Sequence, residues 1–200
     1  ITIDLIYGIP TLSNKNWKEN LRRFFEYKIP HLSSYSLTVE PKTALHTLIK
    51  KNKIKNVVEK ESVHHFEILL EEMQKNNFIH YEISNFALEG YYSKHNSIYW
   101  LGGNYIGVGP SAHSYNGKSR QWNVSSIKSY CEQDNFVNII EEKEVLNQDQ
   151  LFNEYVLTSI RTSWGCDLEH INNLFGEKYS RHFLKNVKMI INEKKIFRKG

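Results

Sequence analysis

The sequence predicts an α/β fold followed by a small helical module. Two short apolar runs, at residues 1–8 and 32–39, have the β-branched and aliphatic character of buried strands, and a helical repeat lies between them. Strand, helix and strand within about forty residues form a βαβ unit, which implies parallel strands. From residue 148 onward the patterns are helical. With 200 residues and 40% hydrophobic content, the chain can bury a real core.

The helix of the βαβ unit begins at Ser13 or Asn14, either of which can cap it, and runs to about Tyr27. Its apolar side chains recur at helical spacing: Trp17, Leu21, Phe24 and Phe25. Pro41 stops the second strand. Residues 42–56 are basic and poorly periodic, which predicts a loop with one helical turn.

Parallel α/β sheets and barrels bind ligands at the carboxyl ends of their strands, so residues 4–8 and 38–40 are where we expect function. Asp4 is the one acidic member of its apolar strand. A carboxylate inside such a run is costly unless it is paired or directed at a ligand. From the residues alone, Asp4 can have either a structural or a functional role.

A helix is predicted over residues 59–75, and Asn76 and Asn77 end it. Its predicted inner face consists of Val63, Phe66, Leu69, Leu70 and Met73. His64 and His65 lie beside that face and are interpreted as a surface and rim pair. Residues 80–87 alternate like a single strand.

The segment from Lys94 to Tyr115 combines two histidines, four glycines and several aromatic rings. This mixture indicates a bound ligand, because rings stack, imidazoles carry protons and glycines allow close backbone approach. A pair of short strands whose rings belong to the core explains the same composition. Residues 117–138 predict a loop and a short helix over 124–132.

Three helices are predicted in the C-terminal part: 148–162, a short helix capped by Asp167 that runs to Phe175, and 177–194 after a break at Gly176. Such an arrangement resembles a helix-turn-helix or winged-helix unit. We therefore expect two domains, residues 1–145 and 146–200. Because the chain opens directly in a strand and closes where a wing strand would begin, we also expect it to be a fragment.

The net charge is +4, with basic runs within residues 50–55 and 185–199. These runs can attract an anionic partner or simply form a solvated face. No apolar run approaches the roughly 18 residues that span a bilayer, and the first residues do not resemble a signal peptide, so a cytoplasmic location is expected. Cys131 and Cys166 form no CxxC or CxxxC pair, which predicts neither a disulfide scaffold nor a self-contained metal site.

Five ordered blocks within residues 1–120 carry a resemblance to a known family: DLIYGIP at 4–10, LSSYSLTVEPKTAL at 32–45, YEISNFA at 81–87, HNSIYW at 95–100 and GVGPSAHS at 107–114. Together they resemble the oxygen-independent coproporphyrinogen III oxidase family of radical SAM proteins. That family has an oxidase branch and a haem chaperone branch. SLTVEPKT and HNSIYW are closer to the chaperone branch.

The resemblance implies the C-terminal part of a partial (β/α)6 radical SAM barrel, followed by a winged-helix-like tail. It also implies S-adenosylmethionine (SAM) and a [4Fe–4S] cluster held by a CxxxCxxC loop in the intact protein. No such loop occurs in this sequence. This span is therefore expected to perform no radical chemistry alone.

Carried over residue by residue, the resemblance implies SAM contacts at Asp4 and Thr38. An ordinary threonine at a strand end is the alternative for Thr38. His113 falls at a third SAM-contacting position, where the oxidase has a nonpolar side chain. The histidine is a departure from that pattern, and its role is left open.

For haem, the resemblance implies contacts from His95, Tyr99 and Trp100, with His95 as the iron ligand. A neutral imidazole can ligate haem iron, and aromatic rings can pack on a porphyrin. The alternative is a structural His95 beside a turn capped by Asn96.

The leading hypothesis is a cytoplasmic haem chaperone that binds haem and passes it to a membrane or respiratory acceptor. The second is the true oxidase, which converts coproporphyrinogen III to protoporphyrinogen IX by oxidative decarboxylation. The third is a winged-helix module that binds nucleic acid. The presumed recognition helix, residues 177–194, has mixed charge, so no nucleic acid is expected.

Overall fold

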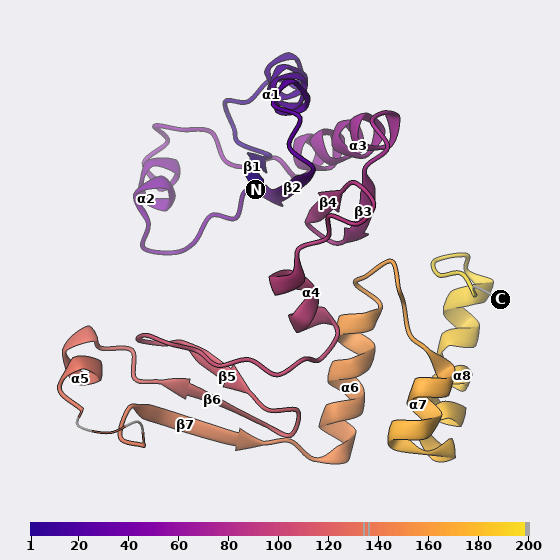
Figure 1. The fold of residues 1–200 in the computed structure, drawn as a ribbon. Coiled ribbons are helices and arrows are strands. Elements are labelled where there is room, and N and C mark those ends of the chain that lie inside the picture. The colour runs from indigo at the N-terminus through magenta and orange to yellow at the C-terminus, as the bar shows by residue number, and fades with distance from the viewer. Residues whose placement is uncertain (134, 136, 199–200) are drawn as a thin grey trace. The chain divides into compact units, whose positions relative to one another are not determined.

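The computed structural model describes residues 1–133, 135 and 137–198, and its chain forms two compact units, Ile1–Lys94 and His95–Gly200 (Figure 1). Each unit is considered by itself. The predicted boundary between residues 145 and 146 falls inside the second unit, and the two-domain division remains a prediction. Lys199 of the basic C-terminal run lies outside the described residues.

The first unit is built on a four-stranded sheet of order β1-β2-β4-β3. Its elements are β1 (Ile3–Tyr7), α1 (Asn14–Glu26), β2 (His31–Ser36), α2 (Ala44–Lys50), α3 (Glu59–Lys75), β3 (Ile79–Glu82) and β4 (Asn85–Ala87). β1 and β2 are parallel, which confirms the βαβ unit. β4 pairs antiparallel with both β2 and β3.

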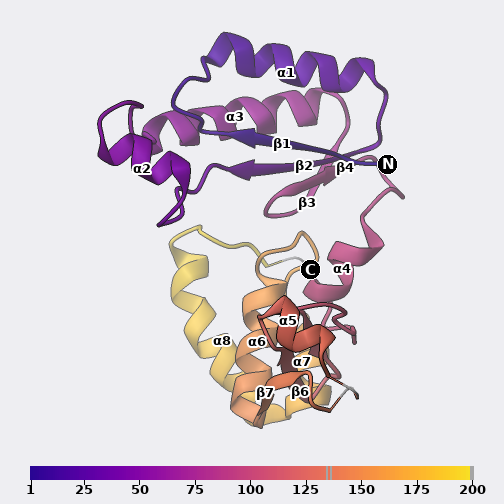
Figure 2. The same ribbon diagram turned by 90° about the vertical axis from the view of Figure 1, so that its left-hand side faces the viewer.

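Helices α1 and α3 lie on the same side of this sheet (Figure 2). The core between them consists of Trp17, Leu21, Phe24, Leu32, Ile68, Leu69, Met73 and Phe86. Full burial of one such side chain contributes roughly 1.5–3 kcal/mol. The predicted cap of α1 is confirmed, since the Ser13 hydroxyl accepts a hydrogen bond from the Asn16 N–H.

The expectation that β1 is a buried strand was wrong. β1 is not buried on both faces: Ile3, Leu5 and Tyr7 pack against the core, whereas Asp4 and Ile6 point the other way and are exposed. Water therefore solvates the Asp4 carboxylate, which needs no partner on the protein.

The inner face of α3 is rotated relative to the prediction. Val63 is 52% exposed, whereas His65 is buried. Two hydrogen bonds hold His65 inward: its Nδ1 accepts from the Gly8 N–H, and its carbonyl accepts from the Trp17 indole. His64 is exposed as expected.

The predicted strand over residues 80–87 is a hairpin, β3 and β4, because the chain turns at Ile83 and Ser84. The Glu82 carboxylate accepts the Ser84 N–H and so holds the turn. In the expected loop, α2 is longer than one turn and is capped by the Thr43 side chain.

The second unit contains a three-stranded antiparallel sheet of order β5-β6-β7. Its elements are α4 (Lys94–Trp100), β5 (His113–Tyr115), β6 (Ser119–Asn123), α5 (Ile127–Cys131), β7 (Ile140–Val145), α6 (Gln148–Ser159), α7 (Leu168–Phe175) and α8 (Glu177–Asn192). The interpretation of residues 94–115 as two strands is wrong for its first part, which is helical. Strands β6 and β7 were not predicted.

The three C-terminal helices are confirmed. Asn147 and Gln150 form a capping box at the start of α6, and the Asp167 carboxylate caps α7. Gly176, at φ 91°, separates α7 from α8. Phe152, Ile171 and Phe175 form the small core of this tail. Among the helices in the described ranges, none has the length and apolar character needed to cross a membrane.

Candidate functional site

Asp4 begins a row of four polar residues that crosses the whole sheet of the first unit. In the strand register, Asp4 is level with Ser33, Ser33 with Asn85, and Asn85 with Glu82. Paired residues project from the same face of a sheet. Because Asp4 points away from the core, the row lies on the face opposite α1 and α3.

The acidic end of this row is buried. Glu82 is 3% exposed and Asn85 is 4% exposed. The Asn85 amide donates a hydrogen bond to the Glu82 carboxylate, and burial raises the pKa of Glu82. The Asn85 Oδ1 is buried without a hydrogen-bond partner in the part of the chain that the structure describes.

A second polar group lies beside the row and contains a buried histidine. His31 Nδ1 is 2.7 Å from the Thr2 hydroxyl, and its Nε2 is 2.8 Å from the Tyr81 hydroxyl. The Tyr81 oxygen also accepts the Ser93 N–H at 3.2 Å. Burial lowers the pKa of His31, which nearby Asp4 partly offsets, and burial raises the pKa of Tyr81 to about 12.

Sequence reasoning missed both polar groups. The signal for one was present in YEISNFA, where Glu82 and Asn85 occur in a short strand-like run. A buried carboxylate requires partners. Predicting a hairpin turn between Glu82 and Asn85 would have indicated that the two side chains are partners.

Thr38 lies two residues beyond β2, at the carboxyl end of the strand. Asp4 is level with Ser33, near the start of β2. The part of the strand from Ser33 to Ser36 already spans roughly 10 Å, because an extended strand rises about 3.3 Å per residue. The two predicted SAM contacts are thus at different levels of the sheet, and the structure does not bring them together.

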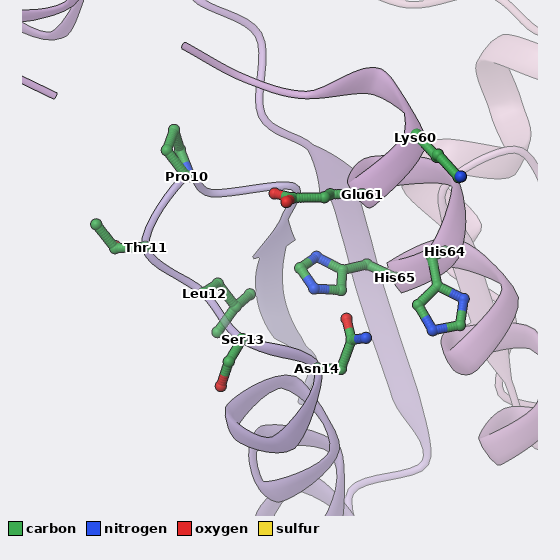
Figure 3. Close-up of a pocket in the computed structure, with 9 residues that line it drawn as sticks. All are labelled: Pro10, Thr11, Leu12, Ser13, Asn14, Lys60, Glu61, His64 and His65. Atoms are coloured by element: carbon green, nitrogen blue, oxygen red, sulfur yellow. The ribbon is translucent and has the colours of Figure 1, made fainter. Parts of the chain in front are cut away.

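A cavity of about 490 Å³ opens at the carboxyl end of β1, between the following loop and α3 (Figure 3). The rings of His64 and His65 and the carboxylate of Glu61 line it from α3, opposite loop residues 10–14. The His65 Nδ1 accepts a hydrogen bond from Gly8 at 3.1 Å, and burial lowers the pKa of His65. The His65 ring is therefore a neutral imidazole that anchors the loop.

His95 lies in the first turn of α4, in the second unit, and is exposed. Tyr99 follows four residues later on the same helix face. The two rings are perpendicular, at 86°, with centroids 5.1 Å apart, and the Tyr99 hydroxyl is 3.4 Å from His95 Nε2. Trp100 is five residues from His95, or about 140° around the helix, so it does not share this face.

His113 lies in β5 of the second unit, whereas Asp4 and Thr38 lie in the first. It is exposed, and its ring lies 5.6 Å from that of Trp122, its partner on β6. His113 and the other two predicted SAM contacts thus belong to different units.

Among the described residues, no group of three or more His, Cys, Asp or Glu side chains could hold a metal ion. Cys131 and Cys166 are both free, and burial raises the pKa of the Cys166 thiol to about 11. A thiol in this state is a poor metal ligand, because thiolates are the ligating form. The described residues therefore provide no cluster site.

No protein-family model matches this chain. Two proteins named heme chaperone HemW are similar to it: that of Lactococcus lactis is 30% identical over 197 residues, covering 98% of this chain and 52% of the relative, and that of Bacillus subtilis is 33% identical over 189 residues, covering 90% and 47%. The zebrafish mitochondrial radical S-adenosyl methionine domain-containing protein 1 is 31% identical over 113 residues, covering 56% and 26%.

The solved structure of the radical SAM enzyme coproporphyrinogen III oxidase (HemN) from Escherichia coli matches 97% of this chain and 48% of its own, with a TM-score of 0.74 and 18% identity. This likeness shows a shared fold and confirms the expected α/β class. The chain spans about half the length of the curated relatives it matches.

Proposed function

Because the chain belongs to the HemW/HemN-like family of radical SAM proteins, we propose that it is part of a haem chaperone, which binds haem and transfers it to an acceptor. The observation that carries the proposal is the pair His95 and Tyr99, an exposed imidazole and an aromatic ring on one face of α4. Similarity to proteins named heme chaperone HemW supports it.

His95 is the proposed iron ligand. A neutral imidazole binds haem iron through one ring nitrogen, and the other nitrogen is commonly held by a hydrogen bond. The Tyr99 hydroxyl, 3.4 Å from Nε2, can hold that nitrogen and leave Nδ1 for the iron. Because His95 is exposed, haem bound there stays accessible to an acceptor, as transfer requires.

The proposal assigns Trp100 a lesser role than the resemblance implied, because it lies off the His95–Tyr99 face of α4. Asp4, Thr38 and His113 remain candidate SAM contacts. SAM and a [4Fe–4S] cluster belong to the intact protein in this proposal, and the cluster ligands come from outside residues 1–200. Two free cysteines fit a reducing, cytoplasmic compartment.

A haem titration of the intact protein, run beside a coproporphyrinogen III turnover assay, tests the proposal. We expect a stoichiometric Soret band with haem and no vinyl product from coproporphyrinogen. Vinyl product in good yield would instead identify the protein as an oxidase. Absence of a Soret change at micromolar haem would exclude haem binding and with it the chaperone function.

A further inference from the structure

The rings beside His95 continue beyond α4 as a ladder of three tyrosines. Tyr99 lies 4.7 Å from Tyr105, at 61°, and Tyr105 lies 6.0 Å from Tyr115, at 36°, measured between ring centroids. All belong to the second unit. The ladder therefore extends the aromatic face that begins at the proposed iron ligand.

Backbone contacts fix the two later tyrosines. Tyr105 and Tyr115 exchange two backbone hydrogen bonds of 2.9 Å as an isolated antiparallel bridge. Gly107 allows this close approach, since a Cβ there would lie 2.2 Å from the His113 carbonyl oxygen. The Gly107 N–H also donates to the Ser114 hydroxyl at 2.9 Å.

A half-buried ion pair holds the far end of the ladder. The Arg120 guanidinium lies 5.8 Å from the centre of the Tyr115 ring and binds Glu154 of α6 at 2.8 Å. A cation over a ring restrains the ring orientation as well as attracting it. The ladder is thus largely formed before any ligand arrives, which lowers the entropic cost of binding.

The surroundings of the ladder combine apolar surface with hydrogen-bond donors. Leu101, Ile106 and Val108 are 66%, 86% and 85% exposed. A cavity of about 640 Å³, within the usual range of ligand sites, is lined by Tyr105 and Tyr115 together with polar side chains that include Asn104 and Asn116. A flat apolar ligand with acidic edge groups matches this combination.

We propose that Tyr105 and Tyr115 are further haem-contacting residues, on which the porphyrin packs as it extends from His95, with its propionates toward the amides of the cavity. This inference rests on the proposed haem binding at His95. Tyr105, which precedes β5, and Tyr115, which ends it, thus add a second set of haem contacts to those of α4.

The test is a haem titration of the intact protein and its variants, read from the Soret band. Tyr105→Ala and Tyr115→Ala should each weaken haem binding about tenfold, or about 1.4 kcal/mol, because each removes a ring on which the porphyrin packs. Tyr105→Phe keeps the ring and should bind within about twofold of the wild type. Tyr27→Ala is the matched control, since Tyr27 is 70% exposed at the end of α1 in the first unit.

The outcomes separate the two proposals. Haem binding that depends on His95 but is unchanged in Tyr105→Ala and Tyr115→Ala would overturn the ladder and leave the chaperone proposal standing. A wild type that binds no haem would overturn both. If circular dichroism shows that an alanine variant is unfolded, Tyr105→Leu or Tyr115→Leu, which keeps apolar volume without a ring, replaces the variant at its own position. The leucine variant must show the same loss of haem binding.

Discussion

The Tyr81 hydroxyl lies 2.8 Å from Nε2 of His31, although the two residues are fifty positions apart in the chain. Both side chains are buried, at 0% and 5% exposure. The hydroxyl also accepts the Ser93 N–H, and His31 Nδ1 contacts the Thr2 hydroxyl. One chain of hydrogen bonds thus joins Thr2, just before β1, to β2, to β3 and to the segment after β4.

Tyr81→Phe should lower the free energy of unfolding by about 1–3 kcal/mol, because it leaves a buried imidazole nitrogen and a backbone N–H without their partner. Urea denaturation of the intact protein measures the change. Tyr91→Phe is the control: Tyr91 is 59% exposed, and its variant should stay within about 0.5 kcal/mol of the wild type. Equal stability of the two variants would show that the Tyr81 hydroxyl is dispensable.

Stability should fall as the solution is acidified from about pH 7.5 to 5.5, because burial lowers the pKa of His31 and of His65. Their folded pKa values lie below the unfolded value of about 6.5, so the unfolded chain binds more protons. The stabilisation is complete above that value and is lost as the pH falls from it through the lower pKa values of the folded state.

Glu82 acts in the opposite sense, since burial raises its pKa and its stabilisation is lost as the pH rises above about 4.5. Thermal melts at several pH values measure the sum. His31→Gln should make the decrease between about pH 7.5 and 5.5 smaller. A His31→Gln profile parallel to that of the wild type would contradict the assigned role of His31.

Gly8→Ala should destabilise the first unit by about 2 kcal/mol or more, for two reasons. Gly8 has φ +72°, and a Cβ there would lie 2.3 Å from the Ser62 hydroxyl oxygen. Gly90→Ala is the matched control, because Gly90 also has positive φ, +82°, but an added Cβ meets nothing within 4 Å. It should cost only about 1 kcal/mol.

Adding Ser62→Ala to Gly8→Ala separates the two causes. The Ser62 hydroxyl is buried and makes no hydrogen bond to the described residues, so its removal costs little. It relieves the closest contact, whereas the Ser62 Cβ stays 3.1 Å from the added Cβ. The double variant should recover part of the lost stability in urea denaturation. No recovery would show that the contact with the Ser62 hydroxyl does not contribute to the loss.

The regular parts of the fold could be predicted because local patterns determine them. The bounds of α3 match the prediction, and the Asp167 cap of α7 was read from the sequence. The rotation of α3 could not be predicted, because it depends on a hydrogen bond from Gly8 to His65, fifty-seven positions apart. Strands β6 and β7 escaped detection because runs such as IEEKEV are charged and lack an apolar alternation.

The candidate site was only partly predictable for the same reason. The family motif singles out His95 and Tyr99, but the helix α4 that puts them on one face was not predicted. The positions of Tyr105 and Tyr115 depend on a backbone bridge between residues ten positions apart, within a stretch whose glycines favour several turns. The polar row from Asp4 to Glu82 depends on the register of four strands, which no single stretch of sequence specifies.

The central claim, that haem iron binds at His95, is tested most directly by the His95→Ala variant of the intact protein. The control is His46→Ala, on α2 of the first unit, where the imidazole belongs to no proposed site. The account predicts that His95→Ala loses the Soret band and ligand-field spectrum of imidazole-ligated haem, whereas His46→Ala keeps both. An unchanged spectrum and affinity in His95→Ala would contradict it.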